Sequence, residues 1–212
     1  MGEKTEKLLS ILKLQPVVPV LIVDDAKSAV PLARALVAGG LKAIEITLRT
    51  AAALDAVRAV AQEVEGAEVG AGTILNAAQF DAAVEAGSRF IVSPGTTQEL
   101  LDAAKSSSVP LLPGAATASE VMALREEGYS VLKFFPAELA GGAAYLKALS
   151  SPLAGTMFCP TGGISLKNAH DYLSLPNVIC VGGSWVAPKE LVSAGNWAEI
   201  TRLASEAAAL EA

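Results

Sequence analysis

Short apolar runs rich in β-branched residues alternate along this chain with alanine-rich amphipathic stretches, and this alternation restricts the possible folds most. It indicates repeated βα units with a parallel sheet, rather than hairpins or a sandwich. We predict eight strands, at residues 17–23, 43–48, 68–73, 90–94, 110–113, 130–136, 156–161 and 178–183. We predict helices at residues 26–38, 51–64, 77–86, 97–106, 118–127, 142–149 and 165–173, with a leading helix at 4–14 and a closing one at 197–210.

Eight parallel strands with intervening helices can close into a (β/α)8 barrel. We therefore expect residues 1–212 to form one domain of the α/β class, a single (β/α)8 TIM barrel with an extra N-terminal helix. The alternative is a doubly wound open sheet, which normally has fewer strands and a glycine fingerprint after the first one. No such fingerprint follows Val23, so the sequence favours the barrel.

Composition narrows the class of function. Of the 212 residues, 52% are apolar, which is enough for one large core. The net charge is -6 without a cationic cluster, so we expect no nucleic-acid partner. Small molecules are the more plausible partners. The charged N-terminus lacks a secretory signal, and the apolar runs are too short to cross a bilayer. We therefore expect a cytoplasmic protein that contacts no membrane. Cys159 and Cys180 are expected to be reduced core residues, with a disulfide as the alternative.

Lys133 lies inside an apolar run, residues 131–136, that is predicted to be the sixth strand. Burial strips an ammonium of its water and favours the neutral, nucleophilic amine, which is the form that a Schiff-base lysine needs. The alternative is a lysine at the end of a strand that extends its charge into solvent. Phe135 and Pro136 follow within three residues, and this apolar bulk favours a buried amine near the carboxyl end of the strand.

The second predicted strand carries Glu45, Thr47 and Arg49 at a spacing of two. The spacing sends these three side chains to one face, predicted to be the barrel interior, near the strand ends where active sites of such barrels lie. Glu45 and Arg49 could form a purely structural buried ion pair. Because Lys133 is also expected to be buried among these strands, a catalytic role for Glu45 and Arg49 is favoured instead.

Small residues follow several other strands. Thr73 comes after a Gly-Ala-Gly stretch that leaves open space beside its hydroxyl. Pro94 ends the fourth strand, where an ordinary turn is the simpler interpretation. Glycine pairs occupy the loops after the seventh strand, beyond Thr161, and after the eighth, before Ser184. These two loops frequently bind phosphate in barrels, because glycines let backbone N–H groups approach the anion. The sequence therefore predicts a phosphate site.

No metal or cofactor is expected. His170 is the one histidine and falls in a predicted helix, so the chain lacks material for a histidine-based zinc site or a Ser-His-Asp triad. Glu45 and Glu138 are the only carboxylates expected near strand ends, which is too few for a magnesium site.

Residues 40–49 and 128–141, which contain Glu45 and Lys133, resemble the 2-keto-3-deoxy-6-phosphogluconate (KDPG) and 4-hydroxy-2-oxoglutarate (KHG) aldolases, and the resemblance extends over nearly the whole chain. It implies a homotrimeric barrel that works without a metal. The implied reaction of the Entner-Doudoroff pathway cleaves KDPG to pyruvate and glyceraldehyde 3-phosphate, and the family also cleaves KHG to pyruvate and glyoxylate. One departure is Ala115, where the family more often has a larger aliphatic residue.

The resemblance implies that Lys133 attacks the C2 carbonyl and that Glu45 is the general acid and base. Eight further residues would bind the substrate: Arg49 and Thr73 at the carboxylate, Phe135 and Pro94 on the apolar side, Thr161 at a hydroxyl, and Gly162, Gly163 and Ser184 at the phosphate. Two other functions stay open from the residues alone. One is a sugar-phosphate isomerase or epimerase in which Glu45 moves a proton and Lys133 is only an electrophile, and the other is a noncatalytic binding protein.

Overall fold

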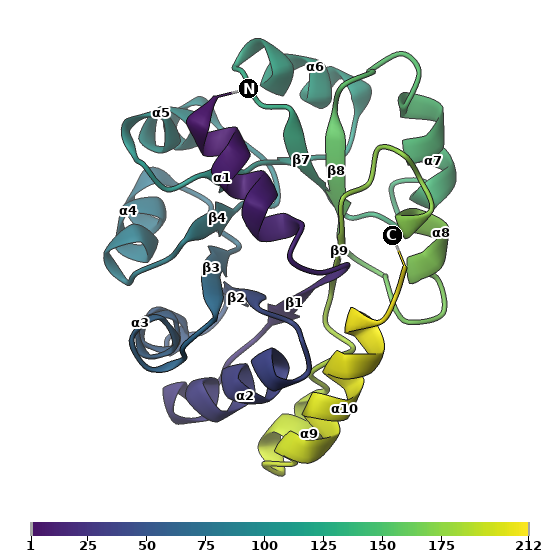
Figure 1. Cartoon of the computed structure of the whole chain (residues 1–212). Coiled ribbons are helices and arrows are strands. Elements are labelled where there is room, and N and C mark those ends of the chain that lie inside the picture. The colour runs from purple at the N-terminus through teal and green to yellow at the C-terminus, as the bar shows by residue number, and fades with distance from the viewer. Residues whose placement is uncertain (1, 212) are drawn as a thin grey trace.

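The structure, a computed structural model, describes residues 2–211 and consists of parallel strands in a curled sheet with helices packed around it (Figure 1). The strands are β1 (Val17–Leu21), β2 (Ala43–Thr47), β3 (Glu68–Gly72), β4 (Phe90–Val92), β5 (Leu111–Leu112), β6 (Gly114–Ala115), β7 (Val131–Phe134), β8 (Met157–Pro160) and β9 (Val181–Gly183). The helices are α1 (Glu3–Leu12), α2 (Ala26–Ala38), α3 (Ala53–Glu63), α4 (Ala77–Glu85), α5 (Gln98–Ser106), α6 (Ala118–Glu126), α7 (Gly142–Leu149), α8 (Ala169–Leu173), α9 (Lys189–Ser193) and α10 (Trp197–Ala208). The expected α/β class with parallel strands is confirmed.

The strands form two parallel sheets, in the orders β5-β4-β3-β2-β1-β9 and β6-β7-β8. Between β5 and β6 stands a single residue, Pro113, which has no backbone N–H to donate to a neighbouring strand. The predicted strand at 110–113 is therefore split and extended by Gly114 and Ala115. Two isolated parallel bridges, Phe158 with Val178 and Thr161 with Gly182, link the β8 side to the segment that contains β9.

Half of the ten helices given above begin at a residue whose side chain caps the first turn. The side chains of Asp25, Asn76, Thr97, Thr117 and Asn196 each accept a hydrogen bond from a backbone N–H in the first turn of α2, α4, α5, α6 and α10. These N–H groups have no partner within the helix, so the caps fix where each helix begins.

The predicted helices agree with the structure except near the last two strands. α2 and α7 have the predicted bounds, whereas the helix expected at 165–173 is reduced to α8. Its first turn is replaced by a loop in which Asn168 Oδ1 accepts the backbone N–H of Ser165 at 2.8 Å. The short helix α9 was not predicted.

The strand residues alternate between the inside of the curled sheet and the helix layer. On β2, Ile44 and Ile46 pack with the helices, whereas Ala43 belongs to a separate inner cluster. That inner cluster joins α1 to the strands, and its buried members are Leu8, Ile11, Leu12, Val18, Ala43, Phe90, Val92, Leu112, Val131, Cys159, Ile179 and Cys180. Apolar packing therefore fills the interior below Glu45 and Lys133, each of which lies two residues beyond a cluster member on its own strand.

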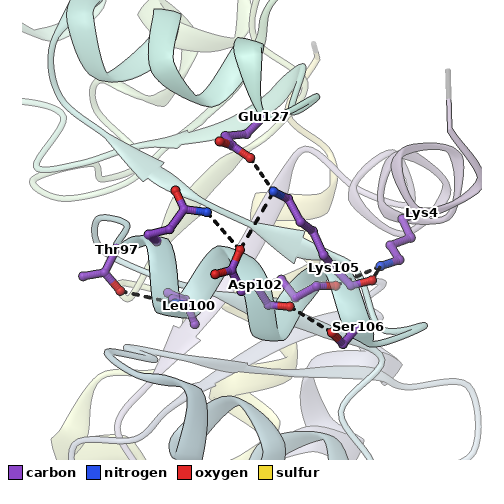
Figure 2. A network of polar contacts seen from close by, with 9 residues as sticks. Lys4, Thr97, Leu100, Asp102, Lys105, Ser106 and Glu127 are labelled. Atoms are coloured by element: carbon purple, nitrogen blue, oxygen red, sulfur yellow. Dashed lines mark hydrogen bonds and ion pairs between the residues drawn. The ribbon is translucent and has the colours of Figure 1, made fainter.

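Helix α1 lies across the centre of the curled strands (Figure 1) and is tied to α5 by one side chain. Lys4 Nζ donates to the backbone oxygens of Ala104 and Lys105, at 2.8 Å each, in the last turn of α5. Lys105 is itself paired with Glu127 at 2.5 Å and approaches Asp102 at 4.0 Å, as Figure 2 shows. The positive charge of Lys4 lies at the negative, C-terminal end of the α5 dipole, so the contact of Lys4 with α5 helps to hold α1 in place.

Cys159 and Cys180 are buried free thiols, as expected. The hydrogen bond with Cys159, together with burial, holds the pKa of Cys180 well above its usual range, so its thiol stays protonated. None of the helices within residues 2–211 has the length and apolar character needed to cross a bilayer.

Candidate active site

Lys133 lies in β7 with 4% of its side chain exposed. In register beside it are Gly114 on β6 and Cys159 on β8, and its backbone N–H donates to Pro113. Its Nζ atom lies 5.3 Å from the centre of the Phe135 ring. The predicted burial of this lysine is confirmed, and the solvent-directed alternative is wrong.

The partner of Lys133 is Glu45. The Nζ atom of Lys133 lies 3.5 Å from Oε1 of Glu45, and both side chains are 4% exposed. Glu45 lies in β2, in register with Val20 on β1 and Gly70 on β3. The two charges therefore meet inside the curled sheet although 88 positions separate them in sequence. Losing hydration is costly for both groups, so the pairing is what makes their burial tolerable.

Arg49 is not buried beside Glu45, and the expectation that it lies in the interior is wrong. β2 ends at Thr47, and a turn in which Arg49 N donates to Thr47 O at 2.8 Å carries Arg49 to the surface, where it is exposed. Its Nε atom donates to Thr73 Oγ1 at 3.2 Å. Thr73 has a left-handed backbone with φ of 60°, a costly conformation for a residue with a branched side chain.

A cavity of about 220 Å³ opens at the carboxyl ends of β1, β8 and β9. Six of the ten predicted site residues line it: Arg49, Phe135, Thr161, Gly162, Gly163 and Ser184. Lys133, Glu45, Thr73 and Pro94 are not among its lining residues. Phe135 links the cavity to the buried Lys133, because this residue lines the cavity and its ring also lies against the amine of Lys133.

Pro94 lies beside the strand that neighbours Lys133. A Cβ atom on Gly114 would be 2.3 Å from the carbonyl carbon and oxygen of Pro94, so the two backbones are in direct contact. Gly114 is in turn the register partner of Lys133. The half-buried Pro94 is therefore one strand away from the amine.

The glycine loops present unused backbone donors to this cavity. Gly162, Gly163, Ile164 and Ser184 line it, and within residues 2–211 none of their N–H groups has an acceptor. Gly162 and Gly163 have φ values of 103° and 78°, which glycine adopts without strain. Successive free N–H groups form a concave site suited to an anion. Ile164 is a lining residue that the sequence did not single out.

A second cavity, of about 510 Å³, shares Val20, Ile22 and Ser184 with the first and extends toward α2 and α9. Its rim includes the exposed pair of Asp24 and Lys189, whose charged atoms are 2.9 Å apart. Sequence reasoning missed it because α9 was not predicted. Across residues 2–211 no group of three or more His, Cys, Asp or Glu side chains is arranged to hold a metal ion.

The sequence profile of the family described as KDPG and KHG aldolase matches residues 8–203. The chain belongs to this aldolase family. A family relative, the 2-dehydro-3-deoxy-phosphogluconate aldolase of Pseudoalteromonas atlantica, is 53% identical over 194 residues, covering 92% of this chain and 90% of the relative. The KHG/KDPG aldolase of Escherichia coli is 51% identical over 198 residues, covering 93% of each chain.

A solved structure of the family has nearly the same fold. KDPG aldolase from Legionella pneumophila superposes with a TM-score of 0.93 at 45% identity, covering 95% of this chain and 98% of that one. That crystal holds pyruvate captured at low pH as a covalent carbinolamine intermediate. The comparisons give no support to a sugar-phosphate isomerase or epimerase.

Proposed function

We propose that this aldolase is a class I enzyme that cleaves KDPG to pyruvate and glyceraldehyde 3-phosphate, and KHG to pyruvate and glyoxylate. The observation that carries the proposal is the buried amine of Lys133, 3.5 Å from the carboxylate of Glu45. A nucleophilic amine and an acid–base group within one contact are the two parts that imine chemistry needs. The names of the two relatives support these substrates.

Catalysis begins at Lys133. Glu45 accepts a proton from the ammonium, and the free amine attacks the C2 carbonyl of the keto acid to give a carbinolamine. Glu45 returns this proton to the carbinolamine hydroxyl, which leaves as water, so that a protonated imine joins Lys133 to C2 and Glu45 is again a carboxylate. The covalent pyruvate adduct of the Legionella relative supports this sequence of steps.

The imine next withdraws electrons from the bond that breaks. Glu45, directly or through one water, removes the proton of the C4 hydroxyl, and the C3–C4 bonding pair moves toward the iminium nitrogen. The aldehyde leaves and an enamine remains on Lys133. Glu45 then returns its proton to C3, and hydrolysis of the imine releases pyruvate and the free amine.

Arg49 and Thr73 bind the carboxylate of the keto acid. The contact between Arg49 Nε and Thr73 Oγ1 holds the guanidinium at the mouth of the site, and within residues 2–211 both of its terminal nitrogens are free for a carboxylate. Phe135 and Pro94 form the apolar side, and Thr161, which is buried next to Gly182, contacts a substrate hydroxyl.

The phosphate of KDPG binds at the free N–H groups of Gly162, Gly163 and Ser184. Phe135 both lines the cavity and lies beside the Lys133 amine, which suits a substrate with its keto acid at one end and its phosphate at the other. KHG has no phosphate and leaves these donors to water.

The one-residue break at Pro113 and the two bridges to the β9 segment support a closed single-domain (β/α)8 barrel with α1 as an extra N-terminal helix. We also infer a cytoplasmic homotrimer, as the family resemblance implies. Light scattering on the eluting peak of a sizing column would measure three times the monomer mass, and a monomeric mass would contradict the trimer.

The test of function is release of pyruvate measured with coupled lactate dehydrogenase. The purified chain is expected to release one pyruvate per KDPG, and also to turn over KHG. Comparing KDPG with its C4 epimer reports the stereochemical preference. Conversion of KDPG to an isomer without pyruvate would contradict the proposal.

A further inference from the structure

The loop that follows the Lys133 strand runs alongside the first of the two glycine loops. Ala137 N donates to Thr161 O at 2.8 Å, and Glu138 N donates to Gly162 O at 3.1 Å. The residues just beyond β7 thus hold those just beyond β8 by two backbone hydrogen bonds. Any shift of the β7–α7 loop would move Gly162.

Gly163 rests on the side chain of Glu138. A Cβ atom on Gly163 would lie 2.7 Å from Glu138 Cγ, and the φ of Gly163 is 78°. The glycine therefore allows a close approach that any side chain would block. The stem of Glu138 acts as a floor under the second glycine of the loop.

The carboxylate of Glu138 is held by Tyr172 of α8. The phenol of Tyr172 donates to Glu138 Oε1, although 34 positions separate the two residues. The Tyr172 side chain is 1% exposed, so it is fixed by packing. Burial, followed by the contact with Glu138, raises the pKa of Tyr172, which keeps its phenol protonated as a donor.

The opposite side of the loop is fixed by Asn168. Its Nδ2 donates to Gly163 O at 3.2 Å, and its Oδ1 accepts the N–H of Ser165 at 2.8 Å. The carbonyl groups of Gly162 and Gly163 are thus both engaged by protein. The N–H groups that remain free are those that line the cavity.

We propose that Glu138 and Tyr172 are positioning residues that hold the Gly162–Gly163 backbone so that its N–H groups face the substrate phosphate, and that the pair thereby determines preference for phosphorylated over unphosphorylated substrates. This inference rests on the proposed function. Glu138 and Tyr172 act on the glycine loop at the phosphate end of the site and not at its keto-acid end. Their loss affects phosphate binding and leaves imine chemistry intact.

The first experiment compares Tyr172→Phe with wild type on KDPG and on KHG. Removing only the hydroxyl frees Glu138, and we expect the KM for KDPG to rise about tenfold, the size of one lost hydrogen bond to a charged group. The kcat for KDPG, and both kcat and KM for KHG, should stay within roughly twofold of wild type. The phosphate contact is equally strong in the ground state and the transition state, so its loss changes KM alone. Tyr145→Phe is the matched control, because within the described residues its hydroxyl has no hydrogen-bond partner and it stacks on Phe134 instead.

The second experiment removes the other partner. Glu138→Ala takes away both the acceptor and the floor beneath Gly163, and it is expected to match or exceed Tyr172→Phe. Glu138→Gln keeps the stem and an acceptor oxygen, so it retains most of the affinity. Inorganic phosphate should inhibit KHG cleavage by occupying the same donors. Its inhibition should weaken in the variants in the same order as their affinity for KDPG.

The outcomes separate the two proposals. A wild-type protein that releases pyruvate from neither substrate refutes the function itself. A wild-type protein that cleaves both, with variants that lose KDPG and KHG cleavage equally or lose neither, refutes the positioning role alone. Circular dichroism verifies folding of each variant, and if Tyr172→Phe does not fold, the exposed Glu138 still provides the test through its alanine and glutamine variants.

Discussion

A Cβ atom placed on Gly72 would lie 1.9 Å from Oε1 of Glu45, so the carboxylate occupies the space that a side chain at position 72 would need. Gly72 is the last residue of β3, beside the end of β2. The absence of a side chain there lets Glu45 lie flat against the neighbouring strand and reach Lys133. Gly72 therefore helps to place the carboxylate for which we propose the acid–base role.

Gly72→Ala is expected to displace the Glu45 carboxylate and lower kcat for pyruvate release by about 10²-fold, the usual cost of a misplaced catalytic group. Gly95→Ala is the control, because a Cβ at this exposed glycine meets no atom within 4 Å. Steady-state kinetics on both variants test the idea. Wild-type kcat in Gly72→Ala would show that the carboxylate position is not critical.

Glu45→Gln removes the proposed proton carrier and leaves a side chain of nearly the same shape. We expect kcat to fall by about 10²–10⁴-fold, the usual contribution of general acid–base catalysis. Imine formation with pyruvate should continue slowly, so borohydride still reduces an adduct on Lys133. Turnover at the wild-type rate would mean that another group transfers the proton.

Lys4→Met removes the two hydrogen bonds from α1 to the end of α5 (Figure 2) and should lower the free energy of unfolding by about 1–2 kcal/mol. Urea unfolding measures the change, and pyruvate release is expected to be unaffected. Lys7→Met on the same helix is the control, since within the described residues the Lys7 amine has no hydrogen-bond partner. Equal stability of the two variants would contradict a specific role for Lys4.

Glu120 makes the stability of α6 depend on pH. Its carboxylate accepts the N–H groups of Ala116 and Thr117, and the first of these holds the pKa of Glu120 below its usual value of 4.5. A lowered pKa in the folded state stabilises the protein above pH 4.5, and this contribution is lost as the pH falls through the folded value. Wild type should therefore exceed Glu120→Gln in stability at neutral pH and lose that advantage in acid. A difference that is constant with pH would rule out the charge as the cause.

Local patterns were enough to predict the strands, most helices and the burial of Lys133. The period of two in β2 also predicted correctly that Glu45 faces the interior, because that alternation holds for any half-buried strand. Arg49 departed from the pattern since β2 ends before it, and strand ends depend on hydrogen bonds to neighbours rather than on composition.

Contacts between distant segments were beyond sequence reasoning. The bond from Tyr172 to Glu138 and that from Lys4 to the end of α5 join residues on separate elements, and nothing in the local sequence of either partner indicates the other. The space at Gly72 was noted as open, but its occupant, the Glu45 carboxylate, became evident only from the pairing of β2 with β3.

The most direct test of the central claim is mass spectrometry after borohydride reduction of the protein with pyruvate. The account predicts one stable adduct per chain, located at Lys133 by peptide mapping, and no adduct in Lys133→Arg, whose guanidinium keeps its proton. Lys133→Arg should remain folded and lose roughly 10³-fold or more of kcat. An adduct on a different lysine, or full activity without any adduct at Lys133, would contradict the account.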